Sequence, residues 1–341
     1  MTNQSFEPES ESGLVAHYVI VPPESGKVTR VEFSPAFPDY AVVLYEDRPP
    51  VLYDVRTKLP DAVRRTVVTE ELRPLLLNEE LAVPIRFQTP ACAAAFRRYP
   101  GGDRAEEVAF AFGEGDTAVH RFGLKSRRMR PPVEVEEPIA LAYSGCGNRL
   151  VVGGKNSLLA LYDVQESPLL VNSARGEGEV IGVDINYRNF AFGMTDRSLI
   201  FGFGAKATES QSFHFRDEDG ENSHETIWSA LVCDPFSSLM FAATDSGRFW
   251  LARTESFDGA SCDSIPGSRI IGAQFLEDNF LLVASEAGVV LHQYTRDDDG
   301  RITSMGNGDI YSLDNDKARV VGARHYTYGS YRCVCIALTL S

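Results

Sequence analysis

The sequence predicts an all-β fold, a seven-bladed β-propeller. The first observation is a mostly apolar seven-residue pattern that recurs along the 341-residue chain, with a small fourth residue in six of its seven copies. Its copies are KVTRVEF 27–33, PACAAAF 90–96, EPIALAY 137–143, EVIGVDI 179–185, IWSALVC 227–233, RIIGAQF 269–275 and RVVGARH 319–325. After a long first interval, the copies recur at about the 40–50-residue repeat typical of propeller blades.

The second observation is a hairpin pattern after every copy but the last. Two β-rich runs are joined by a turn of Gly, Asp, Asn or Ser, which is typical of antiparallel strand pairs. These pairs occupy residues 40–55, 108–124, 149–164, 189–203, 239–252 and 280–294. Together with one strand in the connection, each unit has about four short strands, as a propeller blade has.

Three copies carry glycine at the fourth position, namely Gly182, Gly272 and Gly322. The innermost strands of a propeller converge on a narrow central channel. We therefore expect small residues there to relieve crowding between strands, as they do inside tapered barrels.

The two ends of the chain complete the prediction. Residues 1–13 are polar and acidic, which predicts a disordered tail, and residues 14–341 then form a single propeller. The strand-like LVAHYVIV at 14–21 is expected to pair into the last blade and close the ring, because closure removes exposed strand edges. With that strand in place, we expect that either the last blade is one strand short or the natural chain continues past Ser341.

An insertion at 57–83 accounts for the long first interval. Thr69, Glu70 and Glu71 precede an apolar run, and Pro74 suits only a first helical turn, so we expect a short helix on a loop. Such loops often carry binding sites, although a plain surface insertion fits the sequence as well.

The composition limits the function classes. The net charge of −15 argues against non-specific nucleic-acid binding, which needs a basic surface. No apolar run is long enough for a membrane span, and no targeting segment is evident, so we expect an intracellular protein, nuclear or cytoplasmic. Six scattered cysteines predict free thiols in a reducing compartment, with Cys333 and Cys335 packed in the core.

The sequence shows no enzymatic or cofactor motif that fits its context, so we predict no catalysis, cofactor or metal. GGKNS at 153–157 lacks the first glycine of a phosphate loop and lies in a hairpin turn. His214, Glu218, His224 and Glu225 could bind zinc, but a solvated acidic loop fits them better. KSRRMR at 125–130 is the one dense basic run; it suits an import or anion-binding patch, or a solvated loop.

The chain resembles the WD40 family in its blade period, in VEFSP at 31–35, in LYDV at 52–55 and 161–164, and in Asp-bearing turns. Tyr53-Asp54 and Tyr162-Asp163 stand where the family has Trp-Asp. The resemblance implies a protein-interaction platform. It also implies a shared face for the residues before the inner strands and those in the hairpin turns.

Seven residues fall on that face and form a basic and aromatic set that suits an acidic peptide. They are Arg30, Arg48, Lys155, Arg197, Trp228, Arg248 and Arg269.

The segments 22–35, 189–203 and 212–250 are also similar to the WD40 branch that binds GLEBS motifs in mRNA export and the spindle checkpoint. The expected function is therefore a non-catalytic scaffold, a subunit of a multi-protein complex, whose partners carry acidic peptide segments. The rival interpretation is a propeller enzyme, a metal-dependent hydrolase at the channel mouth. Its candidate residues on the inner strands are Glu32, Asp184 and His325.

Overall fold

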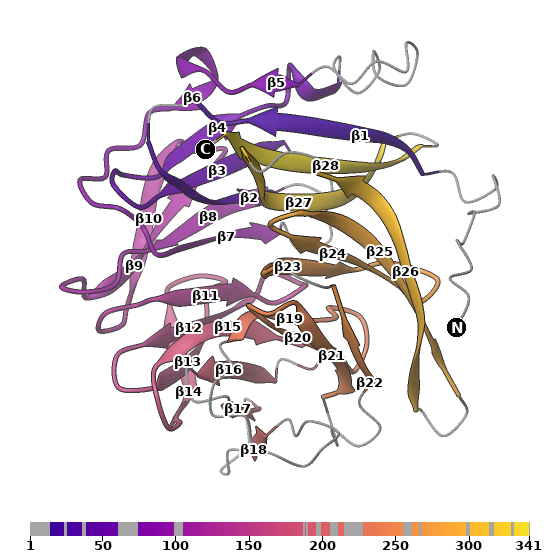
Figure 1. The fold of residues 1–341 in the computed structure, drawn as a ribbon. Helices are drawn as coiled ribbons and strands as arrows, with labels where there is room; N and C mark the ends of the chain where they lie inside the picture. Colours follow the sequence, from indigo (N-terminus) through magenta and orange to yellow (C-terminus); the bar gives the residue numbers. More distant parts are fainter. Residues whose placement is uncertain are drawn as a thin grey trace.

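The described residues form mainly β-strands, arranged as a ring of sheets (Figure 1). The computed structural model describes residues 14–340, and statements below concern these residues. The gaps within that range are 24–25, 36–38, 61–73, 99–104, 187, 189, 196–198, 205–210, 215–227, 255–260, 266–267, 298–300, 314–316 and 329–330.

The described strands form seven four-stranded sheets. Sheet I consists of β2 (Val28–Phe33), β3 (Tyr40–Tyr45), β4 (Val51–Asp54) and β6 (Ala82–Val83). Sheet II consists of β7 (Ala93–Arg98), β8 (Ala105–Ala111), β9 (Ala118–Gly123) and β10 (Arg128–Glu134). Sheet III consists of β11 (Ala140–Tyr143), β12 (Arg149–Gly154), β13 (Leu158–Asp163) and β14 (Leu169–Arg175). Sheet IV consists of β15 (Val180–Ile185), β16 (Ala191–Thr195), β17 (Leu199–Phe203) and β18 (Gln211–His214). Sheet V consists of β19 (Trp228–Cys233), β20 (Leu239–Thr244), β21 (Arg248–Arg253) and β22 (Ser261–Ser264). Sheet VI consists of β23 (Ile270–Phe275), β24 (Phe280–Ser285), β25 (Gly288–Arg296) and β26 (Ile302–Ser312). Sheet VII consists of β27 (Ala318–Tyr328), β28 (Tyr331–Leu340), β1 (Leu14–Val21) and β5 (Leu75–Leu76).

The strands that begin sheets I to VII are those of the repeated seven-residue pattern, and each lies beside the corresponding strand of the next sheet. Strand β27 in turn lies beside β2, which closes the circle. The prediction of an all-β propeller is confirmed, and so is the strand pattern of one repeat strand followed by a hairpin.

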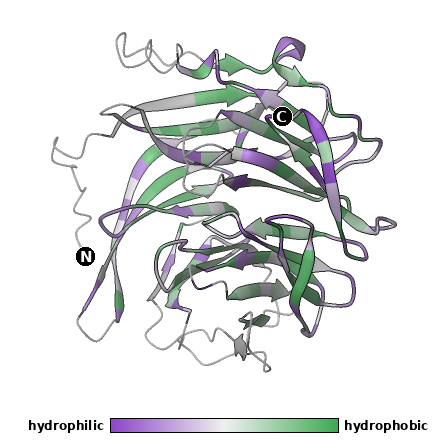
Figure 2. Cartoon of the chain, turned by 180° about the vertical axis from the view of Figure 1, so that it is seen from behind, coloured by the Kyte–Doolittle hydropathy of each residue, from purple (hydrophilic) through white to green (hydrophobic). Residues whose placement is uncertain are grey.

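The core lies between neighbouring sheets. Each buried apolar cluster draws its side chains from two adjacent sheets, and the clusters follow one another around the ring. The second strands, such as YAVVLY in β3 and LMFAAT in β20, are buried along their whole length. Both of their faces meet a neighbouring sheet, which explains their unbroken apolar sequence. Figure 2 shows the apolar residues concentrated within the sheets.

Sheet VII is assembled from three separate parts of the chain. Strand β1 pairs in parallel with β28, with Ile20 opposite Ala337, and β5 pairs in parallel with β1. The N-terminal strand thus pairs into the last sheet, as expected. The parallel direction is possible because β1 does not follow β28 through a tight turn.

The insertion at 57–83 supplies the fourth strands of two neighbouring sheets, β5 in sheet VII and β6 in sheet I. Leu59 and Pro60 are helical, and a 3₁₀ turn covers Glu79–Leu81. The helix start expected at Thr69 lies outside the described residues. The insertion therefore bridges the two sheets between which the ring closes, and its Leu59 is fully buried in the cluster that joins them.

The three repeated glycines do not share one cause. A Cβ at Gly322 would lie 2.2 Å from the carbonyl oxygen of Val31 on the neighbouring inner strand, so the close approach requires glycine. A Cβ at Gly182 would meet the Met194 methyl at 3.1 Å, and one at Gly272 would meet nothing within 4 Å. Crowding therefore explains Gly322, whereas the same expectation is wrong for Gly272.

The described cysteine side chains are free thiols, and those of Cys333 and Cys335 are fully buried on β28. Their alternate positions place both on the same side of the strand, where they join the cluster between sheets VII and I. Burial raises the pKa of Cys333 to about 11 and raises that of Cys335 further. They are core residues, as expected.

Candidate functional site

Sheets I to VI place their loops alternately on two faces of the ring, because successive strands in them run antiparallel. We call the entry face the one where the inner strands begin; it also carries the turns 46–50, 155–157 and 245–247. We call the exit face the one where the inner strands end; it also carries the turn 124–127 between third and fourth strands.

The predicted peptide-binding residues that the structure describes lie at the entry face, and all but one have side chains that are exposed or partly exposed. Arg30, Lys155, Arg248 and Arg269 are exposed there, and Arg48 is partly buried. Arg197 lies outside the described residues.

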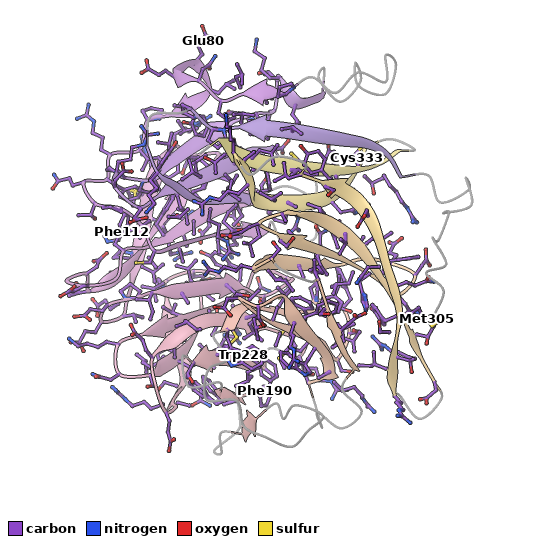
Figure 3. The ribbon with its side chains drawn as sticks, viewed as in Figure 1. Glu80, Phe112, Phe190, Trp228, Met305 and Cys333 are labelled. Carbon is purple, nitrogen blue, oxygen red and sulfur yellow. The ribbon has the colours of Figure 1, made fainter. Side chains whose placement is uncertain are left out.

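Trp228 is the exception, and the prediction that it belongs to a binding surface is wrong. Its side chain is only 3% exposed and packs against Trp250, with ring centroids 5.2 Å apart. Strand β19 begins at Trp228 and turns this side chain into the core between sheets IV and V (Figure 3). The sequence shows that an aromatic residue stands at the start of this strand, but it does not show which way the side chain points.

Carboxylates neutralise much of the charge at the entry face. The Lys155 ammonium lies 2.8 Å from Glu137 and 3.8 Å from Glu136, and Arg30 pairs with Glu32. The Arg48 guanidinium lies 3.7 Å above the centre of the Tyr45 ring. The entry face therefore does not present these cations as one continuous basic surface.

The exit face carries a denser group of cations, which we call the basic patch. Two of its members follow β4, and the others belong to the hairpin between β9 and β10. The patch comprises Arg56, Lys58, Lys125, Arg127, Arg128 and Arg130.

One carboxylate joins the two loops of the basic patch. Asp54 Oδ2 accepts a hydrogen bond from Arg127 at 2.8 Å, and Oδ1 accepts one from Arg56 Nε, also at 2.8 Å. Partial burial alone would raise the pKa of Asp54, but the hydrogen bonds and charges of the two arginines bring it below its usual value. Asp54 therefore stays ionised and fixes the neighbouring loops of sheets I and II together.

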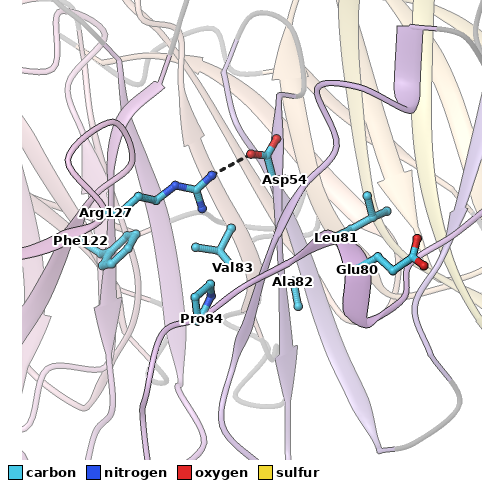
Figure 4. A pocket seen from close by; sticks show the side chains of 8 residues that line it. All are labelled: Asp54, Glu80, Leu81, Ala82, Val83, Pro84, Phe122 and Arg127. Atoms are coloured by element: carbon cyan, nitrogen blue, oxygen red, sulfur yellow. Dashed lines mark hydrogen bonds and ion pairs between the residues drawn. The ribbon is translucent and has the colours of Figure 1, made fainter.

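A hollow of about 450 Å³ opens beside this ion pair (Figure 4). The inserted segment forms one wall, and sheet II forms the other. Its lining residues are Asp54, Glu80, Leu81, Ala82, Val83, Pro84, Phe122 and Arg127. Most of these side chains are apolar, and the Arg127 guanidinium stands at the edge. We call this hollow the seam pocket.

A buried ionic network supports the hairpin from behind. The Glu107 carboxylate is fully buried and accepts hydrogen bonds from Arg121 at 2.8 and 3.0 Å and from the Tyr143 hydroxyl at 2.6 Å. Arg130 Nε lies 3.2 Å from the same carboxylate and its Nη2 donates to Glu106 at 2.8 Å. The network holds the base of the β9–β10 hairpin and links it to sheet III.

Polar side chains on the inner strands bind the next inner strand. Asp184 Oδ2 accepts a hydrogen bond from the Cys233 backbone N–H at 2.7 Å. The Gln274 amide pairs with both backbone groups of His325, at 3.2 and 2.9 Å. Burial raises the pKa of Asp184 to about 7, although two backbone N–H groups lower it.

The candidates for channel-mouth chemistry are engaged in these contacts. Glu32 pairs with Arg30, Asp184 bonds Cys233, and burial lowers the pKa of His325 to about 4. Within the described part of the chain, no three His, Cys, Asp or Glu side chains gather as metal ligands would. The side chains of His214, Glu218, His224 and Glu225 lie outside the described residues. No described helix is both long and apolar enough to traverse a bilayer.

The sequence indicated the charge of the basic patch through KSRRMR, but not its neighbours. Arg56 and the insertion lie some 70 and 45 residues earlier, and only the ring brings them to the hairpin. The seam pocket had no sequence signal, because its two walls come from different sheets.

Comparisons with known proteins agree with the fold. No protein-family model and no curated protein matches the sequence. Among solved structures, the chain is similar to the Myceliophteria thermophila Cps50 (Swd1) β-propeller domain. The TM-score is 0.52 and the identity is 13%, over 66% of this chain and 73% of that one. At this identity the likeness establishes architecture alone: the chain has a β-propeller fold.

Proposed function

We propose that the protein is a WD40-type, seven-bladed propeller that acts as a non-catalytic scaffold in a multi-protein complex. The observation that carries the proposal is the closed ring of packed sheets, which holds two loop-bearing faces in fixed positions. Rigid scaffolds with loops at fixed positions suit the simultaneous display of several binding surfaces.

The solved structure similar to this chain supports the proposal as an analogy of fold. The partners we propose are proteins with acidic segments, and the similarity to the GLEBS-binding branch suggests mRNA export or the spindle checkpoint as the process. We propose an intracellular location, nuclear or cytoplasmic, in keeping with free thiols.

The test is affinity purification of the tagged chain from its native cells, followed by mass spectrometry and quantification. A set of partners recovered in fixed ratio to the bait is the expected result, and nucleoporins or checkpoint kinases among them would support the finer assignment. A bait recovered without partners, together with bound metal in the purified protein, would favour a propeller hydrolase instead.

A further inference from the structure

We propose that the seam pocket and the adjoining basic patch bind a short acidic segment of a partner protein, with one of its apolar side chains inserted in the pocket. This inference deepens the proposed scaffold function and rests on it. It places the acidic peptide on the exit face, at the junction of sheets I and II.

The charge of the patch selects an anionic partner. Its six cationic side chains adjoin four carboxylates, those of Asp39, Asp54, Glu106 and Glu107, in a chain whose net charge is −15. The guanidinium side chains of Arg56 and Arg127 are 48% and 41% exposed even though both contact Asp54. Their outward N–H groups remain in reach of an arriving carboxylate, and arginine binds carboxylates through paired donors.

Asp54 already shows how a carboxylate is held at this place. Its two oxygens take hydrogen bonds from arginines on two different loops. A second carboxylate beside it would meet the same two guanidinium groups from the solvent side. A peptide with consecutive acidic residues can reach Arg127 and the neighbouring Lys125 and Arg128 together, because the three lie on one hairpin turn.

The pocket adds an apolar requirement. Leu81, Val83, Pro84 and Phe122 contribute its apolar carbon, and Asp54, Glu80 and Arg127 give it a polar lining as well. A volume of about 450 Å³ admits a leucine- or phenylalanine-sized side chain. Arg127 belongs to both the patch and the pocket, so the carboxylate and the apolar side chain must be near neighbours in the ligand.

These features favour a peptide over a nucleic acid. A nucleic acid would extend beyond the patch across a chain with a large negative net charge, where its phosphates are repelled. A short acidic segment interacts only with the local positive field. The apolar wall of the pocket also has no role in binding a phosphate backbone.

The test uses a short fluorescein-labelled peptide with one leucine flanked by glutamates and aspartates, titrated with the full-length chain by fluorescence anisotropy. We expect saturable binding that weakens with added salt. The double variant Lys125→Glu/Arg128→Glu should weaken it about tenfold or more, since it reverses two charges and leaves the Asp54 contacts intact. Arg248→Glu/Arg269→Glu on the entry face is the matched control and should bind like wild type.

Two altered probes separate the parts of the site. A peptide with alanine in place of leucine should bind about tenfold less tightly if the pocket takes the apolar side chain. A peptide with glutamine and asparagine in place of the acidic residues should lose most of its affinity. Equal binding of all three peptides, or equal weakening by the patch and control variants, overturns the proposal.

Other occupants have their own outcomes. If a labelled single-stranded oligonucleotide binds more tightly than the peptide and loses affinity in Lys125→Glu/Arg128→Glu, the patch is a nucleic-acid site. If the peptide binds only after Glu7, Glu9 and Glu11 are changed to glutamine, the occupant is the acidic tail of the chain itself. Either result overturns the assignment to a partner.

The same variants separate this inference from the scaffold proposal. Partners that are recovered equally well by wild type and by Lys125→Glu/Arg128→Glu would leave the scaffold intact and overturn the site. Recovery of no partner by any form of the chain would overturn the scaffold. Circular dichroism melting of each variant confirms that the fold is unchanged.

Discussion

The carboxylate of Asp184 on β15 accepts a hydrogen bond from the backbone N–H of Cys233 on β19, across the boundary between sheets IV and V. Gln274 on β23 makes the equivalent bridge to His325 on β27. In both cases the sixth residue of one repeat contacts the seventh residue of the next. Two of the sequence repeats thus include a polar side chain that fastens neighbouring sheets at the centre of the ring.

Asp184 should make the stability of the protein depend on pH. Its pKa of about 7 in the folded chain lies above the ordinary value of 3.8, so the folded state binds the proton more tightly than the unfolded state. The free energy of unfolding should therefore fall as pH rises from about 4 to 7 and level off above it.

Asp184→Asn removes this titration and keeps an oxygen that can accept the Cys233 N–H. Its stability relative to wild type should rise across the same pH range, by about 1–3 kcal/mol at pH 8. Urea unfolding of both proteins at a series of pH values measures the difference. A difference that stays constant from pH 4 to 8 contradicts the assignment.

The repeated glycines supply a matched pair of substitutions. Gly322→Ala should destabilise the protein by about 2–3 kcal/mol, because its Cβ would collide with the Val31 carbonyl oxygen. Gly272→Ala should be neutral or stabilising by up to about 1 kcal/mol, since its Cβ meets open space. Thermal melting distinguishes the two, and equal losses would show that the inner strands pack alike at both positions.

Loss of the buried carboxylate of Glu107 should be far more damaging than loss of a surface ion pair. Glu107→Ala leaves the buried Arg121 guanidinium without its carboxylate, which should cost about 3–5 kcal/mol. The control is Asp163→Asn. Its partner Arg149 is 24% exposed, so the loss should be about 1 kcal/mol or less. Chemical denaturation of both variants gives the comparison.

His292 should change the free energy of unfolding with pH in the direction opposite to Asp184. Its side chain is fully buried beside Phe249; burial lowers its pKa, although the Asn307 hydrogen bond and the nearby Asp263 carboxylate act in the other direction. Because the unfolded chain takes up the proton more readily, the free energy of unfolding should fall as pH drops through about 6.5.

The variant His292→Gln should gain stability relative to wild type as the pH falls below about 6.5, and the difference between the two proteins should be constant on the alkaline side. Unfolding measured between pH 5 and 8, expressed as the difference from wild type, reports this single group. A variant whose acid-side slope equals that of wild type would place the titrating group elsewhere.

Strand periodicity was sufficient to predict the propeller, because each repeat is a local pattern of apolar residues and turns that the ring preserves. Strand periodicity does not predict the burial of Trp228 or the pairing of the entry-face cations. The sequence gives the position of a residue along a strand, but the direction of the Trp228 side chain and the carboxylates beside Lys155 depend on neighbouring sheets.

The seam pocket is another feature that the sequence alone does not predict. The basic run at 125–130 was visible, and so was the insertion at 57–83, but their proximity follows only from the closed ring. The insertion also looked like a surface feature, whereas its β5 and β6 complete sheets VII and I. Short two-residue strands have too few residues to leave a periodic signal in a sequence.

The three-part construction of sheet VII has a consequence during synthesis. Ile20 leaves the ribosome 317 residues before its partner Ala337. At about 5–20 residues per second, β1 waits for β28 for roughly 15 s or more. During that interval β1 can pair only with the two-residue strand β5, which is made soon after it. The nascent chain must therefore keep the other edge of β1 from foreign contacts, and the ring closes only when β28 reaches it.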